Sequence, residues 1–244
     1  MGGPLRVLMG VTMQDLSNYV PPARPEFQQR QGRYARLERL RAHLHADELF
    51  RAYDGAEELW QFLPYGPFIS AAAYHRFLRG FEAGEDPVFY AIRDMARGQV
   101  MGVASYLRIA PEKGSIELGH ICLGPALQKS PAATEAFFMM MSWAFEAGYR
   151  RFEWKCDARN LPSRRAAQRL GLSYEGVFRQ DNIVKGKNRD TAWFAAIDAE
   201  YPALKEAFTA WLLPQNFDAT GRQIERLSDL TGLVRVARDP ALGS

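Results

Sequence analysis

The residues best suited to chemistry lie in a short polar loop, Gln128-Lys129-Ser130, directly before an amphipathic stretch. In that stretch, apolar residues recur at the spacing of one helical face: Ala133, Ala136, Phe137, Met140, Met141, Ala144 and Ala147. The first turn of a helix carries unpaired backbone N–H groups and the positive end of the helix dipole. The sequence therefore predicts a phosphate-sized anion site where this helix begins.

A strand and a second helix follow, and both carry polar groups that could act in a reaction. Phe152, Trp154 and Cys156 alternate with charged residues, which predicts a half-buried strand. The next helix is entered through Asn160-Leu-Pro-Ser163, where the amide and the hydroxyl either cap the helix or reach a ligand. Residues 114–171 are therefore expected to form one unit, around which the rest of the chain is organised.

The totals describe an ordinary globular protein. The chain has 244 residues, 47% of them hydrophobic and 24% charged, with a net charge of +3. This charge predicts no polyanion-binding surface, and the arginine clusters between residues 150 and 189 are also compatible with a solvated face. No apolar run is long enough to span a membrane. The lack of a recognisable secretory signal favours a cytoplasmic protein in which Cys122 and Cys156 are reduced and buried.

The chain divides into three segments by composition and periodicity. Residues 1–31 carry four prolines and predict an N-terminal arm, residues 32–200 the domain, and residues 201–244 a C-terminal helical extension. Strands are expected at 32–37, 88–92, 100–108, 115–123, 152–156, 174–184 and 191–197. Helices are expected at 43–53, 70–84, 133–147, from 160 onward, at 202–213 and at 220–230. This order predicts an α/β fold with a mixed, mostly antiparallel twisted sheet flanked by helices.

An aromatic loop, residues 60–68, precedes the second helix and contains two prolines and a glycine. Such a loop can pack as a lid on the core or line a substrate cleft, and the sequence favours neither.

Taken together, these motifs resemble the GCN5-related N-acetyltransferases (GNAT family), and most closely its ribosomal-protein alanine acetyltransferase (RimJ/RimL-like) branch. The resemblance covers about residues 32–198. The matching stretches are Ile116-Glu-Leu-Gly-His-Ile121, Gly124-Pro-Ala-Leu-Gln128, Ala133-Thr-Glu-Ala136, Asn160-Leu-Pro-Ser163, Leu170-Gly-Leu-Ser-Tyr-Glu-Gly176, Phe178-Arg-Gln180 and Lys185-Gly-Lys-Asn-Arg-Asp190.

The resemblance implies a GNAT fold and acetyl-CoA as co-substrate. The residues that it assigns to the pyrophosphate are Gln128, Lys129, Ser130, Ala132, Ala133 and Thr134. Pro131 stands where the family usually has glycine and cannot donate an N–H, although proline is well suited to a first helical position. The Lys129 charge and the hydroxyls of Ser130 and Thr134 are expected to compensate.

The reaction needs a donor for the thioester carbonyl and a proton for the leaving thiolate. The resemblance assigns the first to the backbone of Ile121, Cys122 and Leu123, so that Cys122 need not act as a nucleophile. It assigns the second to Ser163 and a role in holding the CoA arm to Asn160. The tyrosine that many relatives use for the proton is replaced by Ala167.

The general base is the role that the sequence leaves least defined. Asn182 stands where related enzymes place a glutamate, and an amide cannot accept the proton. Glu117 is the leading candidate, with an alternative interpretation as the partner of a basic residue on the sheet; His120 and Asp181 are reserves.

The predicted function is an acetyl-CoA-dependent N-acetyltransferase that moves an acetyl group to a primary amine in a ternary complex. The acceptor, a small molecule or a protein N-terminus, is expected to enter between the aromatic loop and the final hairpin. Four cations on that hairpin favour an anionic or carboxylate-bearing acceptor: Arg179, Lys185, Lys187 and Arg189. The alternative is a CoA-binding module with little or no turnover.

Other partners are not expected. A nucleic-acid binder would interleave aromatic residues with its arginines, and His43 and His45 are two apart on a helix, so they do not face one metal. The sequence thus predicts no metal, no membrane and no nucleic acid, with the N-terminal arm and C-terminal helix as candidate homodimer contacts.

Overall fold

The computed structural model describes residues 15–243, which form an eight-stranded sheet in the order β1-β2-β3-β4-β5-β6-β8-β7. The strands are β1 Gln29–Gln31, β2 Ala35–Arg39, β3 Val88–Asp94, β4 Gln99–Ala110, β5 Ser115–Leu123, β6 Arg151–Asp157, β7 Ser173–Val184 and β8 Lys187–Ile197. The helices are α1 Ala42–Ala52, α2 Ala71–Glu82, α3 Pro131–Glu146, α4 Leu161–Arg169, α5 Tyr201–Trp211 and α6 Leu227–Thr231. All neighbouring strands are antiparallel except β5 and β6, which run parallel as predicted from the helical crossover between them.

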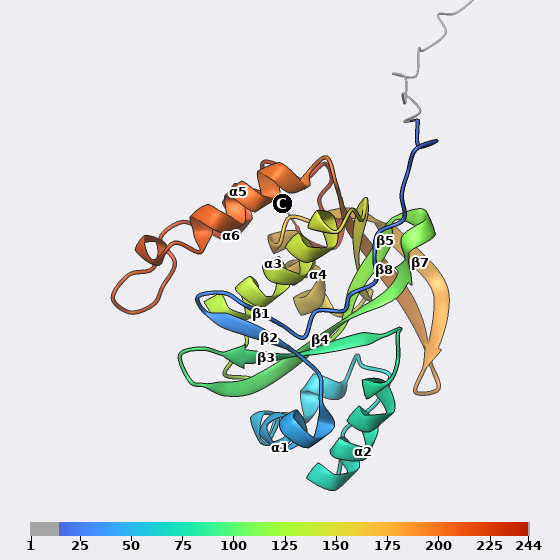
Figure 1. Ribbon diagram of the computed structural model, residues 1–244, viewed down its shortest axis with the longest axis vertical. Helices are drawn as coiled ribbons and strands as arrows, with labels where there is room; N and C mark the ends of the chain where they lie inside the picture. Colours follow the sequence, from blue (N-terminus) through green and yellow to red (C-terminus); the bar gives the residue numbers. More distant parts are fainter. Residues whose placement is uncertain (1–14, 244) are drawn as a thin grey trace, which may run out of the picture.

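The sheet separates two layers of helices (Figure 1): α1 and α2 lie below it, and α3, α5 and α6 lie above it. Strand β3 shows how the sequence builds both cores. Val88, Tyr90 and Ile92 pack into the cluster with α3, whereas Phe89 and Ala91 pack into the cluster with α1 and α2. Alternate side chains of a strand point to opposite faces, so a continuous apolar run supplies both cores.

Helix α3 has a recognisable signal at each end. The Ser130 hydroxyl accepts a hydrogen bond from the Ala133 N–H at 3.0 Å, and Pro131 occupies the first turn. At the other end Gly148 has a φ of +104°, and the N–H groups of Gly148 and Tyr149 return to the carbonyls of Phe145 and Ala144. The predicted capping residues therefore fix where this helix begins and ends.

Strand β5 contains a β-bulge that matters for the site. Ser105 of β4 pairs with Gly119, but Val103 pairs with Cys122, so β5 has one extra residue between these pairs. His120 takes up the irregularity with a φ of +49°. As a result Leu118 packs on the α3 side of the sheet and Cys122 on the α1 side, although both have even numbers.

A buried carboxylate joins α3 to the β1–β2 hairpin. Glu135 accepts hydrogen bonds from the N–H groups of Arg33, Tyr34 and Ala35 at 2.6–2.9 Å. Gly32 is required beside it, because a Cβ at that position would overlap the carboxylate. Residues 29–31, predicted to belong to the arm, instead form β1, which pairs with β2. Residues 1–14 of the predicted arm lie outside the described residues.

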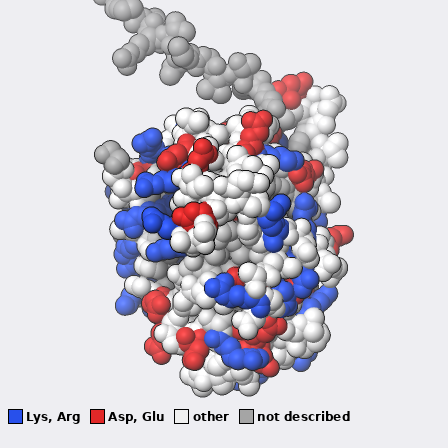
Figure 2. Space-filling view, turned by 90° about the vertical axis from the view of Figure 1, so that its left-hand side faces the viewer, with Lys and Arg blue, Asp and Glu red and all other residues white. Residues whose placement is uncertain are grey.

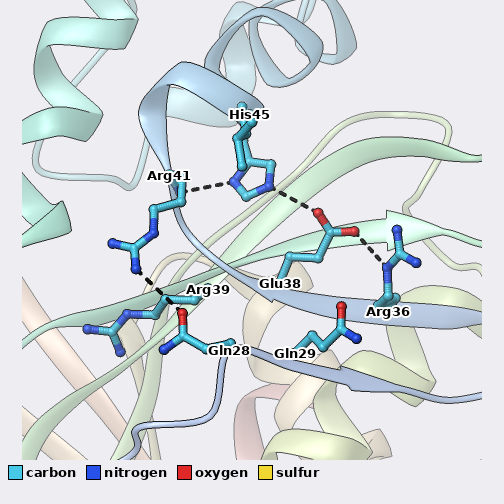
Figure 3. Close-up of a pocket in the computed structure, with 8 residues that line it drawn as sticks. Gln28, Gln29, Arg36, Glu38, Arg39, Arg41 and His45 are labelled. Carbon is cyan, nitrogen blue, oxygen red and sulfur yellow. Dashed lines mark hydrogen bonds and ion pairs between the residues drawn. The ribbon is translucent and has the colours of Figure 1, made fainter.

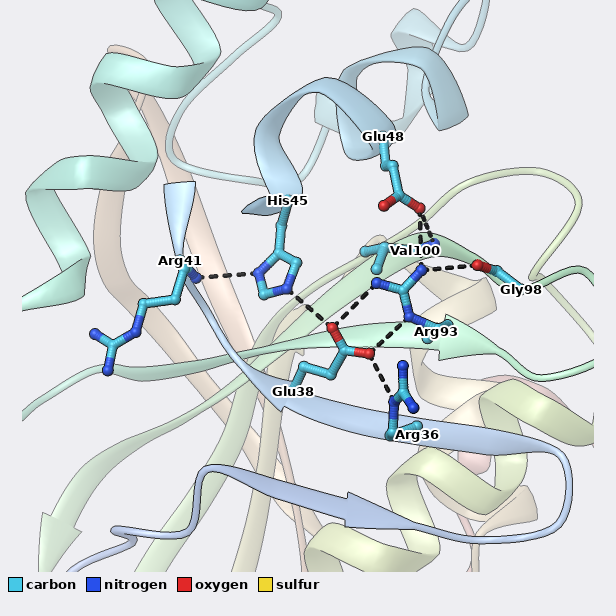
Figure 4. A network of polar contacts seen from close by, with 8 residues as sticks. All are labelled: Arg36, Glu38, Arg41, His45, Glu48, Arg93, Gly98 and Val100. Atoms are coloured by element: carbon cyan, nitrogen blue, oxygen red, sulfur yellow. Dashed lines mark hydrogen bonds and ion pairs between the residues drawn. The ribbon is translucent and has the colours of Figure 1, made fainter. Parts of the chain in front are cut away.

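A polar network fastens α1 to the sheet. Glu38 of β2 pairs with Arg36 and Arg93, and His45 bridges Glu38 to the Arg41 backbone N–H (Figure 4). Because the Arg41 N–H donates to Nδ1, the His45 proton lies on Nε2 and faces Glu38. The network also borders a shallow polar pocket lined by Gln28, Gln29, Arg36, Glu38, Arg39, Arg41, Leu44 and His45 (Figure 3).

The C-terminal segment packs against α4. Arg164 of α4 makes a two-pronged ion pair with Asp239, with both distances 2.6 Å, and the two side chains are 6% and 0% exposed. The predicted helix at 220–230 is shorter in the structure, because Asp218 accepts from the Thr220 and Arg222 N–H groups and forms a turn there. Among residues 15–243, no helix is both long and apolar enough to cross a membrane.

Candidate active site

The bulge in β5 opens the sheet. The parallel pairing of β5 with β6 stops at the pair Leu118 and Trp154. The bulged segment of β5 begins just beyond, after Gly119. His120 and Ile121 have no partner residue on β4 or on β6. The backbone of Ile121 therefore lies outside both ladders and is available to a bound molecule.

A cavity of about 680 Å³ occupies this opening. Its walls come from the separated ends of β5 and β6, the start of α4, the aromatic loop and the β7–β8 hairpin. Its polar and functional lining residues include Glu58, Gln61, Arg108, Glu117, His120, Cys122, Gln128, Lys155, Cys156, Asp157, Asn160, Ser163, Asn182 and Arg189. The aromatic loop thus serves both roles considered for it, since Trp60 packs in the core while Leu63 and Pro64 line the cavity.

The three bulge residues Ile121, Cys122 and Leu123 all line the cavity, as predicted for the carbonyl site. The Cys122 carbonyl accepts from the Tyr53 hydroxyl at 3.1 Å, and the Leu123 carbonyl accepts from Gln128 Nε2 at 3.1 Å. These bonds hold the bulge rigidly and bring the predicted phosphate-loop residue Gln128 to its edge.

The start of α3 is organised more tightly than the sequence suggested. The Ala133 N–H is taken by the Ser130 hydroxyl, and the Thr134 hydroxyl donates to the Ser130 carbonyl at 3.2 Å. Ala132, Ala133 and Thr134 are buried and lie outside the cavity lining. Lys129 is exposed with a φ of +56°. Only Gln128 of the six predicted phosphate residues therefore borders the cavity itself.

Arg169 is a cation at this helix start that the sequence analysis did not single out. Its Nη1 donates to the Thr134 hydroxyl at 3.1 Å, and its guanidinium lies over Trp211. Burial lowers its pKa from the ordinary value, and its side chain has no acidic partner among residues 15–243. The sequence carries no pattern that predicts this contact, because Arg169 reaches Thr134 only when α4 is packed beside α3.

At the start of α4, Asn160 is the capping residue, and both Asn160 and Ser163 line the cavity. Asn160 Oδ1 accepts from the Ser163 N–H at 3.1 Å. Ser163 Oγ accepts from Trp154 Nε1 at 2.9 Å, and because tryptophan can only donate, the serine proton is free to point elsewhere. The capping interpretation therefore holds for Asn160, whereas the Ser163 hydroxyl bonds to Trp154 and not to the helix backbone. The assignment of both residues to a ligand stays a prediction.

Two thiols line the opening, Cys122 on β5 and Cys156 on β6. Both are free and buried, as predicted. Burial raises the pKa of Cys122 to about 12 and that of Cys156 to about 11, the latter partly offset by a hydrogen bond with Ser163. Neither is the low-pKa thiol that a nucleophile requires.

Glu117 is fully engaged by cations. Its two oxygens accept from Arg108 at 2.6 and 2.9 Å, and Lys155 lies 3.1 Å from one of them. The Glu117 and Lys155 side chains are 3% and 5% exposed, and Lys155 also contacts Glu153 and the face of Trp193. The alternative interpretation of Glu117, as a partner of basic residues, is therefore present, and a base role would have to operate from within this ion pair.

His120 lies in the same wall with its ring against aromatic side chains. Its Nδ1 is 3.2 Å from the Tyr65 hydroxyl, and the two rings are stacked. The pKa of His120 is lowered to about 4, mainly by burial and in addition by the charges of Arg108 and Arg189. The imidazole is therefore neutral at pH 7 and able to accept a proton.

The final hairpin closes the other side of the cavity. Lys185 donates from Nζ to the Trp60 carbonyl at 2.8 Å, which joins the hairpin to the aromatic loop. Arg189 is the only one of the four predicted hairpin cations that lines the cavity, and its Nε is buried without a hydrogen-bond partner among the described residues. Asn182 lines the cavity beside it, whereas Asp181 does not.

On the face shown in Figure 2, basic and acidic side chains are interspersed, with basic ones more frequent along its left-hand margin. In the part of the chain that the structure describes, no group of three or more His, Cys, Asp or Glu residues could hold a metal ion.

The site is thus an opening in the sheet, where bulged β5 parts from its parallel neighbour β6 beside the capped start of α3. The sequence profile of the acetyltransferase (GNAT) domain matches residues 35–173. The chain therefore belongs to the GNAT acetyltransferase family, and it is an acetyl-CoA-dependent N-acetyltransferase by membership.

Solved structures support this assignment. A GCN5-related N-acetyltransferase from Brucella melitensis is 46% identical, with a TM-score of 0.86, covering 88% of this chain and 99% of that one. A GNAT-family acetyltransferase from Chromobacterium violaceum ATCC 12472 is 35% identical, with a TM-score of 0.75, covering 83% and 100%. RimL, a ribosomal L7/L12 alpha-N-protein acetyltransferase solved with coenzyme A, shares the fold at 21% identity and a TM-score of 0.59, covering 68% and 95%. No curated protein sequence matched the chain significantly.

The residues present fit acetyl-CoA, which supplies the activated acetyl group. The strand opening leaves Ile121 outside both ladders, and Gln128 marks the side nearer the start of α3. Lys129 and Arg169 are the side chains at that helix start with capacity for phosphate.

Proposed function

We propose that the chain transfers the acetyl group to a primary amine by direct attack in a ternary complex. The observation that carries this proposal is the single cavity that joins the strand opening to the aromatic loop and the β7–β8 hairpin. An acyl donor between β5 and β6 and an amine between the loop and the hairpin would share this space. Holding both reactants in one site provides the orientation that direct transfer needs.

In the proposed reaction, the amine nitrogen attacks the carbonyl carbon and the carbon–sulfur bond breaks. The backbone around Ile121 is suited to stabilise the negative charge that develops on the carbonyl oxygen. Ser163, with its proton not used by Trp154, is suited to donate a hydrogen bond or a proton to the departing sulfur.

The amine must lose a proton, and two side chains in one wall are candidates to receive it. Glu117 remains a candidate base, acting through a water molecule because both its oxygens already accept from cations. His120 is the second candidate, since it is neutral at pH 7 and lines the cavity. If Glu117 is the base, it must accept a proton while it is paired with Arg108 and Lys155. His120 is not held in an ion pair with any of the described residues.

Release of free thiol from acetyl-CoA over a panel of amines tests the proposal. Glu117→Gln, His120→Gln and Ser163→Ala are compared with the unchanged protein. Loss of the true base should lower kcat by roughly 10²-fold and remove the corresponding limb of the pH–rate profile. Loss of Ser163 should lower kcat more than KM. Tight CoA binding without thiol release from any amine would instead favour a binding module.

A further inference from the structure

The charged groups that line the cavity are nearly all neutralised by neighbours. Glu117 pairs with Arg108 and Lys155, and Asp157 pairs with Arg159 at 2.7 Å. Two of the charged lining residues have side chains with no ion pair or hydrogen bond to the described residues, Glu58 and Arg189. Glu58 is exposed to solvent and needs no partner in the protein. Among the described lining residues, Arg189 is therefore the cation that lacks a partner although it is partly buried.

Arg189 is partly withdrawn from solvent. It lies on β8 opposite Asn182 of β7, and both residues line the cavity. Its Nε is buried and makes no hydrogen bond with the described residues. Buried polar atoms in folded proteins nearly always have a partner, and an unpaired guanidinium fork matches the geometry of a carboxylate.

The position of Arg189 separates it from the phosphate end of the site. Its charge acts on His120, Cys156 and Asp157, which are at the separated ends of β5 and β6. The start of α3, with Lys129 and Arg169, is where the co-substrate phosphates are expected. An anion that binds Arg189 is therefore expected to belong to the acceptor.

We propose that Arg189 binds a carboxylate of the acceptor, so that the acceptor is a free amino acid or a similarly small molecule carrying both an amine and a carboxylate. This inference rests on the proposed function and narrows it. The main-chain carboxylate of a protein whose N-terminus was the acceptor would lie far from its amine, so this proposal argues against protein N-termini as a class.

The common amino acids and their carboxamides are the matched probes, since each pair differs only in the carboxylate. Thiol release is measured with each pair across pH, because amidation lowers the pKa of the amine and the comparison needs pH-independent values of kcat/KM. The unchanged protein should prefer the acid of at least one pair. Arg189→Gln should lower kcat/KM for that acid by roughly 30-fold or more and leave its amide nearly unaffected.

Lys187→Gln is the matched control, because Lys187 lies two residues earlier on the same strand and outside the cavity lining. It should retain the preference. CoA affinity, measured by calorimetry, should be the same in both variants and in the unchanged protein. Weakened CoA binding in Arg189→Gln would overturn the proposal by assigning Arg189 to the co-substrate.

Equilibrium binding of the same acids and amides to the CoA-loaded protein separates this proposal from the proposed function. Thiol release with equal efficiency for acids and amides would overturn the carboxylate site and leave N-acetylation intact. Absence of thiol release with any amine would contradict the proposed function. In that case, the binding of amino acids would decide whether Arg189 forms a carboxylate site. Acid binding that Arg189→Gln abolishes supports the site, and no binding of any amino acid overturns it.

Discussion

At the scale of single residues, Glu117 shows how one carboxylate can be both structural and available to chemistry. It is nearly inaccessible, yet it lines the cavity and holds Arg108 and Lys155. Removing one partner of a buried ion pair costs far more than the pair contributes, because the remaining charge is left desolvated. Activity data on Glu117 variants therefore need a stability measurement beside them.

We expect Glu117→Leu to lower the free energy of unfolding by about 3–5 kcal/mol, because it leaves buried Lys155 with only Glu153. Arg108→Leu, at a side chain that is 55% exposed, should cost under about 1 kcal/mol. Urea unfolding followed by tryptophan fluorescence measures both. Equal, small losses would show that the pair is not effectively buried.

The pKa of His120 provides a second test at this scale. Burial lowers it first, and the charges of Arg108 and Arg189 add to the effect, while Asp86 opposes it and neutral Tyr65 faces the ring. Arg189→Gln removes one positive neighbour, so the pKa should rise above about 4 but stay below 6.5, because burial remains.

Titration of the His120 ring protons by NMR measures this shift. Lys187→Gln, outside the cavity, should leave it unchanged. A fall in the His120 pKa in Arg189→Gln would contradict the placement of the Arg189 charge beside the ring.

At the scale of elements, the Glu135 carboxylate accepts hydrogen bonds from three N–H groups in the β1–β2 turn that would otherwise have no partner. A charged acceptor makes stronger hydrogen bonds than a neutral one. The turn and helix α3 are thus joined through one side chain, and α3 begins at the loop that is predicted to bind phosphate.

We expect Glu135→Ala to destabilise the protein by at least about 3 kcal/mol, because it leaves the buried Ala35 N–H and the part-buried N–H groups of Arg33 and Tyr34 without their acceptor. Glu146→Ala on the same helix removes an exposed pair with Lys205 and should cost under about 1 kcal/mol. Chemical denaturation of the two variants side by side is the measurement, and similar losses would argue against the buried turn contact.

Elements with local signals could be predicted from the sequence, and those set by distant partners could not. Ser130, Pro131 and Gly148 mark the ends of α3 within the helix's own sequence. The bulge at His120 depends on the register between β4 and β5, which no local pattern specifies. Strand β1 is three residues long and exists because β2 pairs with it, so its sequence carries little strand signal.

The site follows the same division. The capping role of Asn160 and the neighbourhood of Ile121 and Gln128 could be expected from motifs. The pairing of Glu117 with Lys155 and the contact of Arg169 with Thr134 join residues from different elements and required the assembled fold.

At the scale of the whole molecule, the segment after residue 200 packs against the helix that carries Ser163. The family profile ends at residue 173, but Asp239 pairs with Arg164 on the helix that carries Ser163. We expect Asp239→Ala to cost about 3–5 kcal/mol of stability, since Arg164 would be left buried and unpaired.

Activity should fall in this variant even under conditions where it remains folded, because α4 loses its anchor. Asp229→Asn, at an exposed residue of α6, is the control and should alter neither quantity. Thermal unfolding together with thiol release measures the two effects, and an unaffected Asp239→Ala protein would show that the tail only covers the domain.

Acid sensitivity is also a property of the whole fold. Burial raises the pKa of Glu38, but hydrogen bonds from Arg93 and Arg36 outweigh it and lower the value from 4.5 to about 2. A carboxyl with a depressed folded pKa contributes fully above about pH 4.5, and this contribution is lost as pH falls towards 2. Glu38→Gln should therefore be less stable than the unchanged protein at pH 7, by about 1.5–3 kcal/mol, and the difference should shrink below pH 4.5.

Unfolding curves collected from pH 7 to pH 2 test this, with Glu57→Gln, at an exposed residue, as the control. A difference between Glu38→Gln and the unchanged protein that did not depend on pH would rule out this carboxyl as the source of the acid sensitivity.

The two thiols in the cavity walls have a consequence for the fate of the enzyme during turnover. A thioester exchanges its acyl group readily with any nearby thiolate, which would leave the protein S-acetylated and the co-substrate wasted. With pKa values of about 11 and 12, Cys156 and Cys122 remain protonated at neutral pH. Their burial therefore protects the catalyst from acylating itself, and we expect intact-mass spectra after prolonged incubation with acetyl-CoA to show no added acetyl group on either cysteine.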